Sequence, residues 1–316
     1  MADLPFDLSG KRVWVAGHQG MVGAALVRRL GREKCDIVAA PRTELDLTDQ
    51  RAVLGWMHNL RPKVVVLAAA KVGGILANSD YPVEFLRDNL LIATAVLSAA
   101  EATGVEKLLF LGSSCIYPRD TAQPISEDAL LSGPLEPTNE PYALAKIAGI
   151  KLAQAYRRQY GCDFISAMPT NLYGPGDNYD LAASHVLPAL IRKVHEAKLA
   201  GGPVEVWGSG TPRREFLHVD DCADACVHLL GHWSDPAPVN VGTGSDIAIL
   251  DLTRLVMEVI GYDGPIIHDH SKPDGAPRKL LDCTRLTALG WQPQIELREG
   301  IAHAYQAFLA GNVRGA

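Results

Sequence analysis

Residues 11–23 read KRVWVAGHQGMVG, a short apolar run followed by three glycines in the spacing GxxGxxG. The run Lys11–Ala16 predicts a strand, and Met21–Lys34 predicts a helix with apolar residues on one face. Glycines at a strand-to-helix turn allow a tight turn and let the backbone approach a pyrophosphate, which the helix N-terminus also favours. The stretch therefore predicts a dinucleotide-binding unit at the start of the chain.

The alternation of strands and helices continues through the first half of the chain. Strands are predicted over 36–40, 63–70, 107–111 and 162–167, and helices over 48–60 with Thr48 as N-cap, 81–103 and 140–160. Nearly continuous apolar strands separated by helices indicate an α/β fold with a doubly wound parallel sheet. Such sheets bind ligands at the carboxyl ends of their strands.

After Asn171–Gly176 the chain breaks into loops rich in Gly, Pro, Asn and Asp. The later elements are predicted to be shorter: helices near 184–199, 220–231 and 250–260, and a strand over 204–207. We therefore predict two domains. Residues 1–173 and about 220–247 form the dinucleotide-binding domain, and residues 174–219 and 248–316 form a smaller C-terminal α/β substrate domain.

Composition excludes several classes of protein. The 316 residues carry a net charge of −6 and are 21% charged and 47% hydrophobic, which argues against disorder and against non-specific nucleic-acid binding. The longest apolar run, Val64–Ala70, is far shorter than the ~18 residues of a membrane helix. With no signal peptide visible, the sequence predicts a cytoplasmic protein. The six cysteines show no metal or disulfide framework, so we predict free thiols and no metal site.

A basic residue follows the second predicted strand. Arg42 stands 19 residues after Gly23, where an acidic residue would hold the ribose hydroxyls of NAD. Because an arginine suits a 2′-phosphate, the sequence predicts NADPH rather than NADH. Asp46 and Leu47 follow closely and could line the adenine site.

Tyr142 and Lys146 place a phenol and an ammonium group one helical turn apart, on one face. A nearby cation is expected to lower the pKa of the phenol, so that Tyr142 can exchange a proton with a carbonyl or an alkoxide. Ser113 follows the predicted strand 107–111, where its hydroxyl could hold the same oxygen. The three residues together indicate carbonyl reduction.

The order of these motifs resembles the extended short-chain dehydrogenases/reductases, which act mainly on nucleotide sugars. The matching stretches are GxxGxxG, Ser113-Ser114-x-x-Tyr117, the YxxxK pair, Asn171–Pro175 and Arg214–Asp221. The resemblance covers nearly the whole chain and implies a Rossmann-type fold. It also implies a homodimer in which helices 81–103 and 140–160 pair through Leu90–Ile92, Ile147 and Ile150.

Within that family, five phrases look closest to members that epimerise GDP-4-keto-6-deoxy-D-mannose at C3 and C5 and then reduce C4 with NADPH. The phrases are GSSCIYP at 112–118, LEPTNEPY at 135–142, MPTNLYGP at 168–175, SHV at 184–186 and PDGAPRKLLD at 273–282. Inversion of a carbon needs a base on one face of the ring and an acid on the other. The resemblance implies Cys115 as the base and His185 as the acid.

The resemblance also implies two sets of binding residues. The cofactor set is Gly17, Gln19, Gly20, Met21, Val22, Gly23, Arg42, Asp46, Leu47, Ala69, Leu111, Gly112, Ser113, Ser114, Tyr142, Lys146, Pro169, Asn171, Leu172 and His185. The GDP-sugar set is Asn171, Lys193, Trp207, Arg214, Asp274 and Lys279. Lys193 and Gln19 each stand where the family usually has arginine. Positive charge for the diphosphate is expected from Arg213–Arg214, Arg278–Lys279 and Lys193.

Two other functions remain open from sequence. One is a nucleotide-sugar 4,6-dehydratase or 4-epimerase of the same fold, but Ser114-Cys115 stands where a dehydratase would carry an Asp-Glu pair. The other is a non-catalytic protein that senses the dinucleotide, against which the retained Tyr142, Lys146 and Ser113 argue. Consumption of NADPH by a 4-keto sugar nucleotide distinguishes the leading hypothesis from both.

Overall fold

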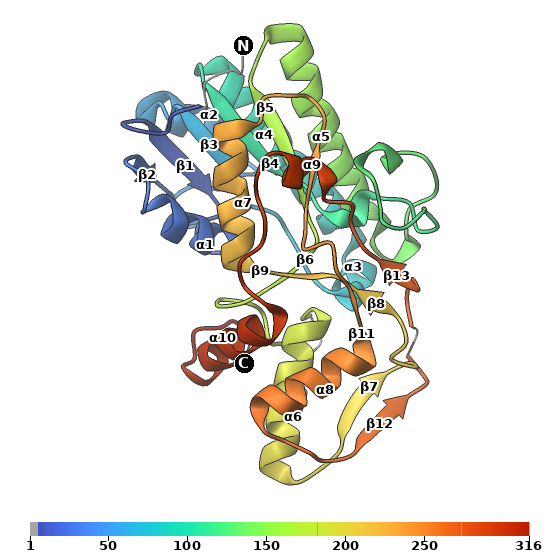
Figure 1. The fold of residues 1–316 in the computed structure, drawn as a ribbon. Coiled ribbons are helices and arrows are strands. Elements are labelled where there is room, and N and C mark those ends of the chain that lie inside the picture. Colours follow the sequence, from blue (N-terminus) through green and yellow to red (C-terminus); the bar gives the residue numbers. More distant parts are fainter. Residues whose placement is uncertain (1–5, 182, 273, 316) are drawn as a thin grey trace.

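The structure is a computed structural model that describes residues 6–181, 183–272 and 274–315. Its larger unit is built on a six-stranded parallel sheet with the strand order β10-β5-β4-β3-β1-β2 (Figure 1). The strands are β1 (Arg12–Ala16), β2 (Asp36–Val38), β3 (Val64–Leu67), β4 (Lys107–Leu111), β5 (Phe164–Pro169) and β10 (Val239–Val241). The predicted doubly wound α/β fold is confirmed.

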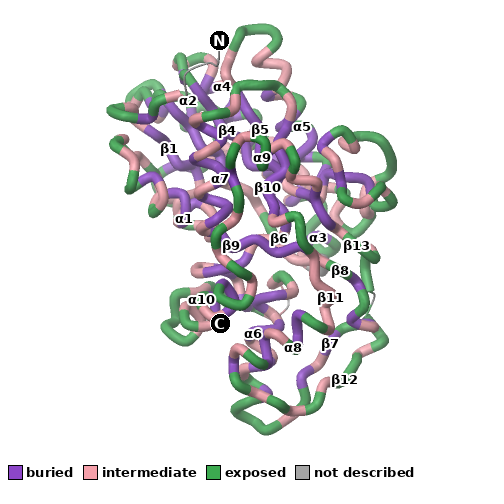
Figure 2. Tube along the Cα trace, viewed as in Figure 1, coloured by how far each residue is buried: buried purple, intermediate pink, exposed green. Residues whose placement is uncertain are grey.

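Helices cover both faces of this sheet, and Figure 2 shows the strands as a buried centre. The covering helices are α1 (Met21–Leu30), α2 (Gln50–Leu60), α4 (Pro82–Ala102), α5 (Glu140–Tyr160) and α7 (Val219–His232). Side chains alternate across a strand, so Val13 and Val15 pack with α1 and α7, whereas Trp14 and Ala16 pack with α2, α4 and α5. Within the described ranges, no helix is long and apolar enough to cross a membrane.

The smaller unit lies below the carboxyl ends of the sheet strands in Figure 1. It holds a separate core formed by α6, α8 and α10 with the small strands around them. Its elements are β6 (Asn171–Tyr173), α6 (Val186–Ala200), β7 (Val204–Trp207), β8 (Arg213–Arg214), β9 (Phe216–His218), β11 (Ile247–Ala248), α8 (Ile249–Ile260), β12 (Ile266–Asp269), β13 (Arg278–Lys279) and α10 (Leu297–Leu309). These strands pair as β12-β7, β11-β8-β13 and β6-β9.

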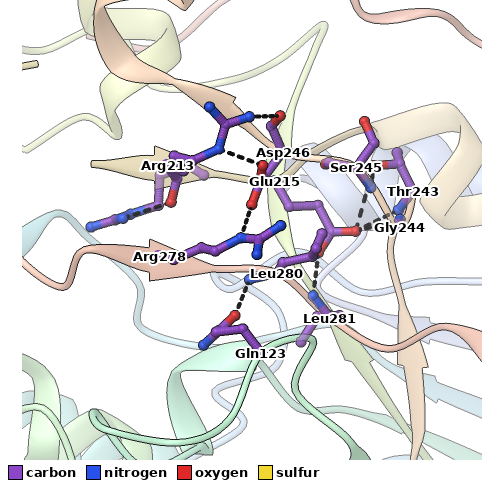
Figure 3. A network of polar contacts seen from close by, with 11 residues as sticks. Gln123, Arg213, Glu215, Thr243, Gly244, Ser245, Asp246, Arg278, Leu280 and Leu281 are labelled. Atoms are coloured by element: carbon purple, nitrogen blue, oxygen red, sulfur yellow. Dashed lines mark hydrogen bonds and ion pairs between the residues drawn. The ribbon is translucent and has the colours of Figure 1, made fainter. Parts of the chain in front are cut away.

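One buried carboxylate fastens the chain segments that run between the two units. Glu215 is fully buried, and its Oε1 accepts hydrogen bonds from the backbone N–H groups of Thr243 and Gly244 at 2.7 and 2.8 Å (Figure 3). Its Oε2 accepts from the backbone N–H of Leu281 at 3.0 Å, and its carbonyl accepts from the Asn171 side chain at 2.8 Å. Glu215 therefore joins the segments around 171, 243 and 281 to its own.

Some predicted element boundaries were wrong. Asp49, not Thr48, is the N-cap of α2, because its carboxylate accepts from the backbone N–H groups of Arg51 and Ala52. The Thr48 hydroxyl instead donates to Asp46 at 2.8 Å. Helix α1 ends at Leu30 rather than Lys34, with Gly31 as its C-cap. By contrast, β4, α5 and β7 have the predicted bounds.

Two expectations about packing also need correction. Ile147 and Ile150, expected on a dimer face, are buried in the core of their own sheet with exposed fractions of 6% and 0%. The C-terminal part also returns to the large sheet, because Leu286 of α9 (Thr284–Ala288) and Trp291 lie in the core beside α1 and α7. The prediction placed all of 248–316 in the second domain, whereas Leu286 and Trp291 pack in the core of the larger unit.

Candidate active site

The strand order reverses beside β1, because the chain leads from β1 to β2 on one side and continues through β3 to β4 on the other. A doubly wound sheet binds its ligand at such a reversal. Here Gly17, at the end of β1, has a φ of +94°, and a Cβ on it would lie 2.7 Å from the Cα of Ala69. Only glycine allows this close approach, so two predicted cofactor residues meet at the switch point.

The rest of the glycine loop is equally constrained. A Cβ on Gly23 would lie 2.1 Å from the carbonyl oxygen of Gly17, so α1 packs directly on the turn that precedes it. Gly20 is the N-cap of α1, and no side chain covers the backbone there. Met21 and Val22 begin the helix, and Gln19 lies exposed before it. The result is a backbone cradle that a Cβ would fill, which fits a pyrophosphate.

Arg42 lies exposed beyond β2. It is near Asp46, whose pKa is lowered first by hydrogen bonds from Thr48 and also by the charge of Arg42. Leu47 packs against the core beside α2. The exposed Arg42 guanidinium can therefore contact a phosphate at the edge of the sheet, although the Asp46 carboxylate lies near it.

Tyr142 and Lys146 face the end of β4 from the first two turns of α5. Lys146 is 4% exposed, and its Nζ donates to the carbonyl of Leu111 at 2.7 Å. Burial lowers the pKa of Lys146 to about 8. We expected Lys146 to lower the pKa of the Tyr142 phenol. The structure shows the opposite net effect, because burial raises that pKa, with a smaller contribution from the nearby Cys115 thiol, and a hydrogen bond with Ser113 only partly opposes the rise.

Ser113 and Cys115 follow β4 directly, in the turn that leads into a short 3₁₀ helix (Ser114–Ile116). The Ser113 hydroxyl accepts from the backbone N–H of Cys115 at 3.2 Å. This bond holds the Ser113 hydroxyl against the backbone of Cys115, and Ser114 between them is buried. Cys115 is half-buried and lies 3.6 Å, Sγ to Nζ, from Lys279 of β13. Thus the end of β4 brings a hydroxyl and a thiol to the phenol.

The remaining predicted cofactor residues lie along the same edge. Gly112 packs against Met168, and a Cβ on it would lie 2.4 Å from that sulfur. Pro169 ends β5, and Leu172 packs on the core beside α1. The Asn171 side chain is committed to the carbonyl of Glu215.

His185 comes from the smaller unit, at the N-cap position of α6. Burial lowers the pKa of His185, which favours the neutral imidazole in the free protein. The loop before it is tied to the larger unit, because the backbone N–H of Gly74 donates to the carbonyl of Ala183 at 3.0 Å. A Cβ on Gly74 would lie 2.8 Å from the carbonyl of Ser184. The loop that carries His185 therefore rests on the start of α3 (Ile75–Asp80).

The predicted GDP-sugar residues of the smaller unit form two groups. Trp207 is 41% exposed, with Lys193 Nζ 4.9 Å and Lys272 Nζ 5.3 Å from its ring centroid. The carboxylate of Glu205 accepts from Lys193 at 3.2 Å and from the Trp207 indole at 3.0 Å. Because Glu205 holds the indole N–H of Trp207, the exposed face of this ring can stack on a nucleotide base.

Asp274 belongs to the second group. Its carboxylate accepts from the backbone N–H and the hydroxyl of Ser209, at 2.7 and 2.9 Å. Arg214 and Lys279 lie opposite each other on the paired strands β8 and β13. Burial lowers the pKa of Arg214, while the Cys115 and Glu136 charges oppose that shift. Arg214 and Lys279 thus face the Cys115 side of the site.

Arg213 and Arg278 do not remain available as expected. Both donate to the Asp246 carboxylate, Arg213 at 2.7 Å, and Asp246 is almost fully buried between them (Figure 3). The sequence offered two adjacent basic pairs, but one arginine of each is engaged by the same carboxylate. Positive charge that can meet a diphosphate is therefore reduced to Arg214, Lys279 and the partly engaged Lys193.

Sequence reasoning missed two functional contributions. Glu215 lies in the quoted stretch Arg214–Asp221 and received no role, although a carboxylate between apolar residues is a signal of a buried polar anchor. The contact between Lys279 and Cys115 joins residues 164 positions apart, and no local pattern indicates it.

Comparisons with known proteins agree with this geometry. The profile of the NAD dependent epimerase/dehydratase family matches residues 13–242. The chain is 56% identical to a GDP-L-fucose synthase of Sinorhizobium fredii, over 96% of this chain and 97% of that protein. It is 53% identical to the GDP-L-fucose synthase of Escherichia coli, over 97% and 99%.

A solved structure is similar over nearly the same length. A GDP-L-fucose synthetase from Naegleria fowleri bound to NADP superposes with a TM-score of 0.91 at 28% identity, over 98% of this chain and 96% of that one. Its fold thus agrees with the sheet and smaller unit described above. The chain therefore belongs to the NAD dependent epimerase/dehydratase family, as an extended short-chain dehydrogenase/reductase similar along nearly its whole length to GDP-L-fucose synthases.

Proposed function

We propose that this protein converts GDP-4-keto-6-deoxy-D-mannose to GDP-L-fucose, by epimerisation at C3 and C5 followed by NADPH-dependent reduction at C4. The observation that carries the proposal is the placement of Cys115 beside the reductive residues Ser113 and Tyr142 at the end of β4. A simple reductase needs no thiol there, whereas an epimerase needs a base. The names and similarity of the relatives support the same activity.

Epimerisation uses the C4 ketone, which acidifies the C–H bonds at C3 and C5. The Cys115 thiolate takes the proton from C3: an S–H bond forms, the C–H bond breaks, and the electron pair moves onto the C4 oxygen as an enolate. His185 takes up a proton from solvent, and its lowered pKa makes the imidazolium a readier acid. It gives that proton to C3 on the opposite face of the ring, and the ketone is restored. The same steps follow at C5 after each group exchanges its proton with solvent.

Reduction uses the same oxygen. NADPH, when bound, supplies the hydride for C4, and the cradle of Gly17, Gly20 and Gly23 fits its pyrophosphate. Tyr142 gives the C4 oxygen its proton, and Ser113 orients that oxygen. Because burial raises the pKa of Tyr142, the phenol keeps its proton until negative charge develops on the substrate. Lys146, anchored on the Leu111 carbonyl, lies where it can hold the nicotinamide ribose.

The proposal extends to compartment and assembly. We propose a cytoplasmic enzyme, as the sequence predicts. We also propose a homodimer through α4 and α5. Leu91 and Leu144 support this face, since they lie on those helices with exposed fractions of 43% and 44%. In this proposal Leu91 and Leu144 supply the apolar dimer contact that the sequence analysis assigned to Ile147 and Ile150, which are buried.

The activity is tested by adding GDP-4-keto-6-deoxy-D-mannose to the purified protein with NADPH or NADH. We expect loss of absorbance at 340 nm, faster with NADPH, and GDP-L-fucose as the product by chromatography. A 4,6-dehydratase, a 4-epimerase or a non-catalytic protein would consume no NADPH. A product that keeps the D-configuration would show that the protein only reduces.

Arg42→Ala tests the cofactor preference. Loss of a charge-assisted contact with the 2′-phosphate should reduce the preference for NADPH over NADH by about 1.5–3 kcal/mol, or roughly 10- to 150-fold in the ratio of kcat/KM values. Arg51→Ala removes another exposed arginine and should leave the ratio unchanged. An unchanged ratio for Arg42→Ala would remove Arg42 from the cofactor site.

Tyr142→Phe separates the two half-reactions. Without the phenol, NADPH oxidation should fall by a factor of at least about 10²–10⁴, the usual contribution of a general acid. Exchange of the C3 and C5 protons with heavy water should remain detectable by NMR. Tyr156→Phe is the matched control on the same helix, since its hydroxyl bonds only Ser98 among the described contacts. Equal loss of exchange and reduction would contradict separate proton-transfer groups.

Cys115→Ser and His185→Gln test the epimerisation pair. Each should slow C3 and C5 epimerisation by about 10²–10⁴-fold, because a general base or acid is lost. Reduction should persist, so NADPH and substrate should yield a 6-deoxy sugar of the D-series. Cys35→Ser, which changes the residue just before β2, is the control. If both variants form GDP-L-fucose at close to the parent rate, Cys115 and His185 have only structural roles.

A further inference from the structure

The residue nearest to the Cys115 sulfur in the hydrogen-bonding network is a lysine from the other end of the chain. Lys279 Nζ lies 3.6 Å from Cys115 Sγ, within the range of an N–H···S hydrogen bond. The resemblance gave Lys279 a role only at the GDP-sugar. The contact of Lys279 with the Cys115 thiol is a second interaction, separate from that predicted role.

Strand pairing holds Lys279 at this point. The backbone N–H of Leu280 donates to the Gln123 side chain at 2.8 Å, and that of Leu281 donates to Glu215 at 3.0 Å (Figure 3). Ile125 donates back to the carbonyl of Leu280 at 2.8 Å. The backbone of the segment that carries the ammonium is thus anchored to the loop around Gln123 and Ile125 and to Glu215.

Three titratable groups face the thiol from three elements. Lys279 comes from β13, Arg214 from β8 and Tyr142 from α5; Lys279 is in hydrogen-bonding range of the sulfur, and Cys115 is close enough to contribute to the pKa of both Arg214 and Tyr142. Two of the three are cations and the third is a neutral phenol. The backbone N–H of Cys115 is already donated to Ser113, so it does not stabilise the sulfur. An anionic sulfur is therefore favoured mainly by side-chain cations.

We propose that Lys279 is a positioning residue that holds Cys115 as the thiolate before substrate binds. A thiolate, not a thiol, is the base that epimerisation requires, and an adjacent ammonium favours the anion. The proposal rests on the proposed function for the use of the thiolate, but the charge state itself is a property of the free protein. Lys279 thus acts on the chemistry through Cys115, besides any contact with the GDP-sugar.

The experiment measures the pH dependence of Cys115 alkylation in the intact protein without substrate. Iodoacetamide reacts with the thiolate: the C–S bond forms, the C–I bond breaks and iodide leaves. Because Cys115 is half-buried rather than sealed, the reagent can reach it, and peptide mass spectrometry separates it from the other five cysteines. The midpoint of the rate profile in the parent protein is compared with that in variants of Lys279, because removal of an adjacent ammonium disfavours the thiolate.

Lys279→Met should raise this midpoint by about 1–3 pH units, the usual effect of removing an opposite charge within 4–6 Å. Lys279→Arg should restore most of the shift. Lys34→Met, which removes an exposed lysine beyond α1, should leave the midpoint at the parent value. A parent midpoint near that of free cysteine would overturn the proposal without any variant. Identical profiles for the parent and a folded Lys279→Met would do the same.

Kinetics separate this role from substrate binding alone. If Lys279 only binds the GDP-sugar, Lys279→Met raises KM and leaves the alkylation profile unchanged, which contradicts the proposal. If it holds the thiolate, kcat for C3 and C5 proton exchange falls, and the loss is partly recovered at higher pH. Failure of the parent to turn over GDP-4-keto-6-deoxy-D-mannose would contradict the proposed function, whereas the alkylation result would still decide the role of Lys279.

Discussion

The burial of Glu215 is the constraint on which the site depends. A carboxylate that is fully enclosed loses its hydration, and this desolvation raises its pKa. Backbone N–H groups of Thr243, Gly244 and Leu281 compensate for that cost, and each comes from a segment that runs between the two units. Because the acceptor is satisfied only when all of these segments converge, Glu215 fixes how the segments that connect the two units lie relative to one another.

The convergence has a direct effect on the chemistry. Arg214 precedes Glu215 in the chain, and Lys279 stands two residues before Leu281, which Glu215 holds. The two cations that face Cys115 are therefore placed by the same anchor. The end of β4, which carries Cys115, belongs to the large sheet and does not bond to Glu215 among the described contacts. The site thus forms where a rigid sheet edge meets strands that Glu215 has positioned.

Local sequence patterns predicted the parts of the site that are close in the chain. The glycine loop after β1 and the Tyr142–Lys146 pair on α5 are short-range features, and their elements have nearly the predicted bounds. Contacts between distant segments could not be predicted in this way. The capture of Arg213 and Arg278 by Asp246 depends on the register of β8, β11 and β13, and a basic pair in the sequence does not show which member will be neutralised. The pKa of Tyr142 was mispredicted for a related reason, since spacing shows the nearby cation but not the burial that outweighs it.

The two proton-transfer groups at the end of β4 need opposite protonation states, and the structure provides opposite surroundings for them. Tyr142 must carry a proton to the C4 oxygen, and burial together with the Cys115 charge raises its pKa, so the proton stays on the phenol. Cys115 must be able to accept a proton, and it lies beside the ammonium of Lys279. The states reinforce each other, because an anionic sulfur disfavours ionisation of the adjacent phenol. The cations beside the thiol and the burial of the phenol therefore favour opposite protonation states, and one sugar ring can meet a base from the turn after β4 and an acid from the start of α5.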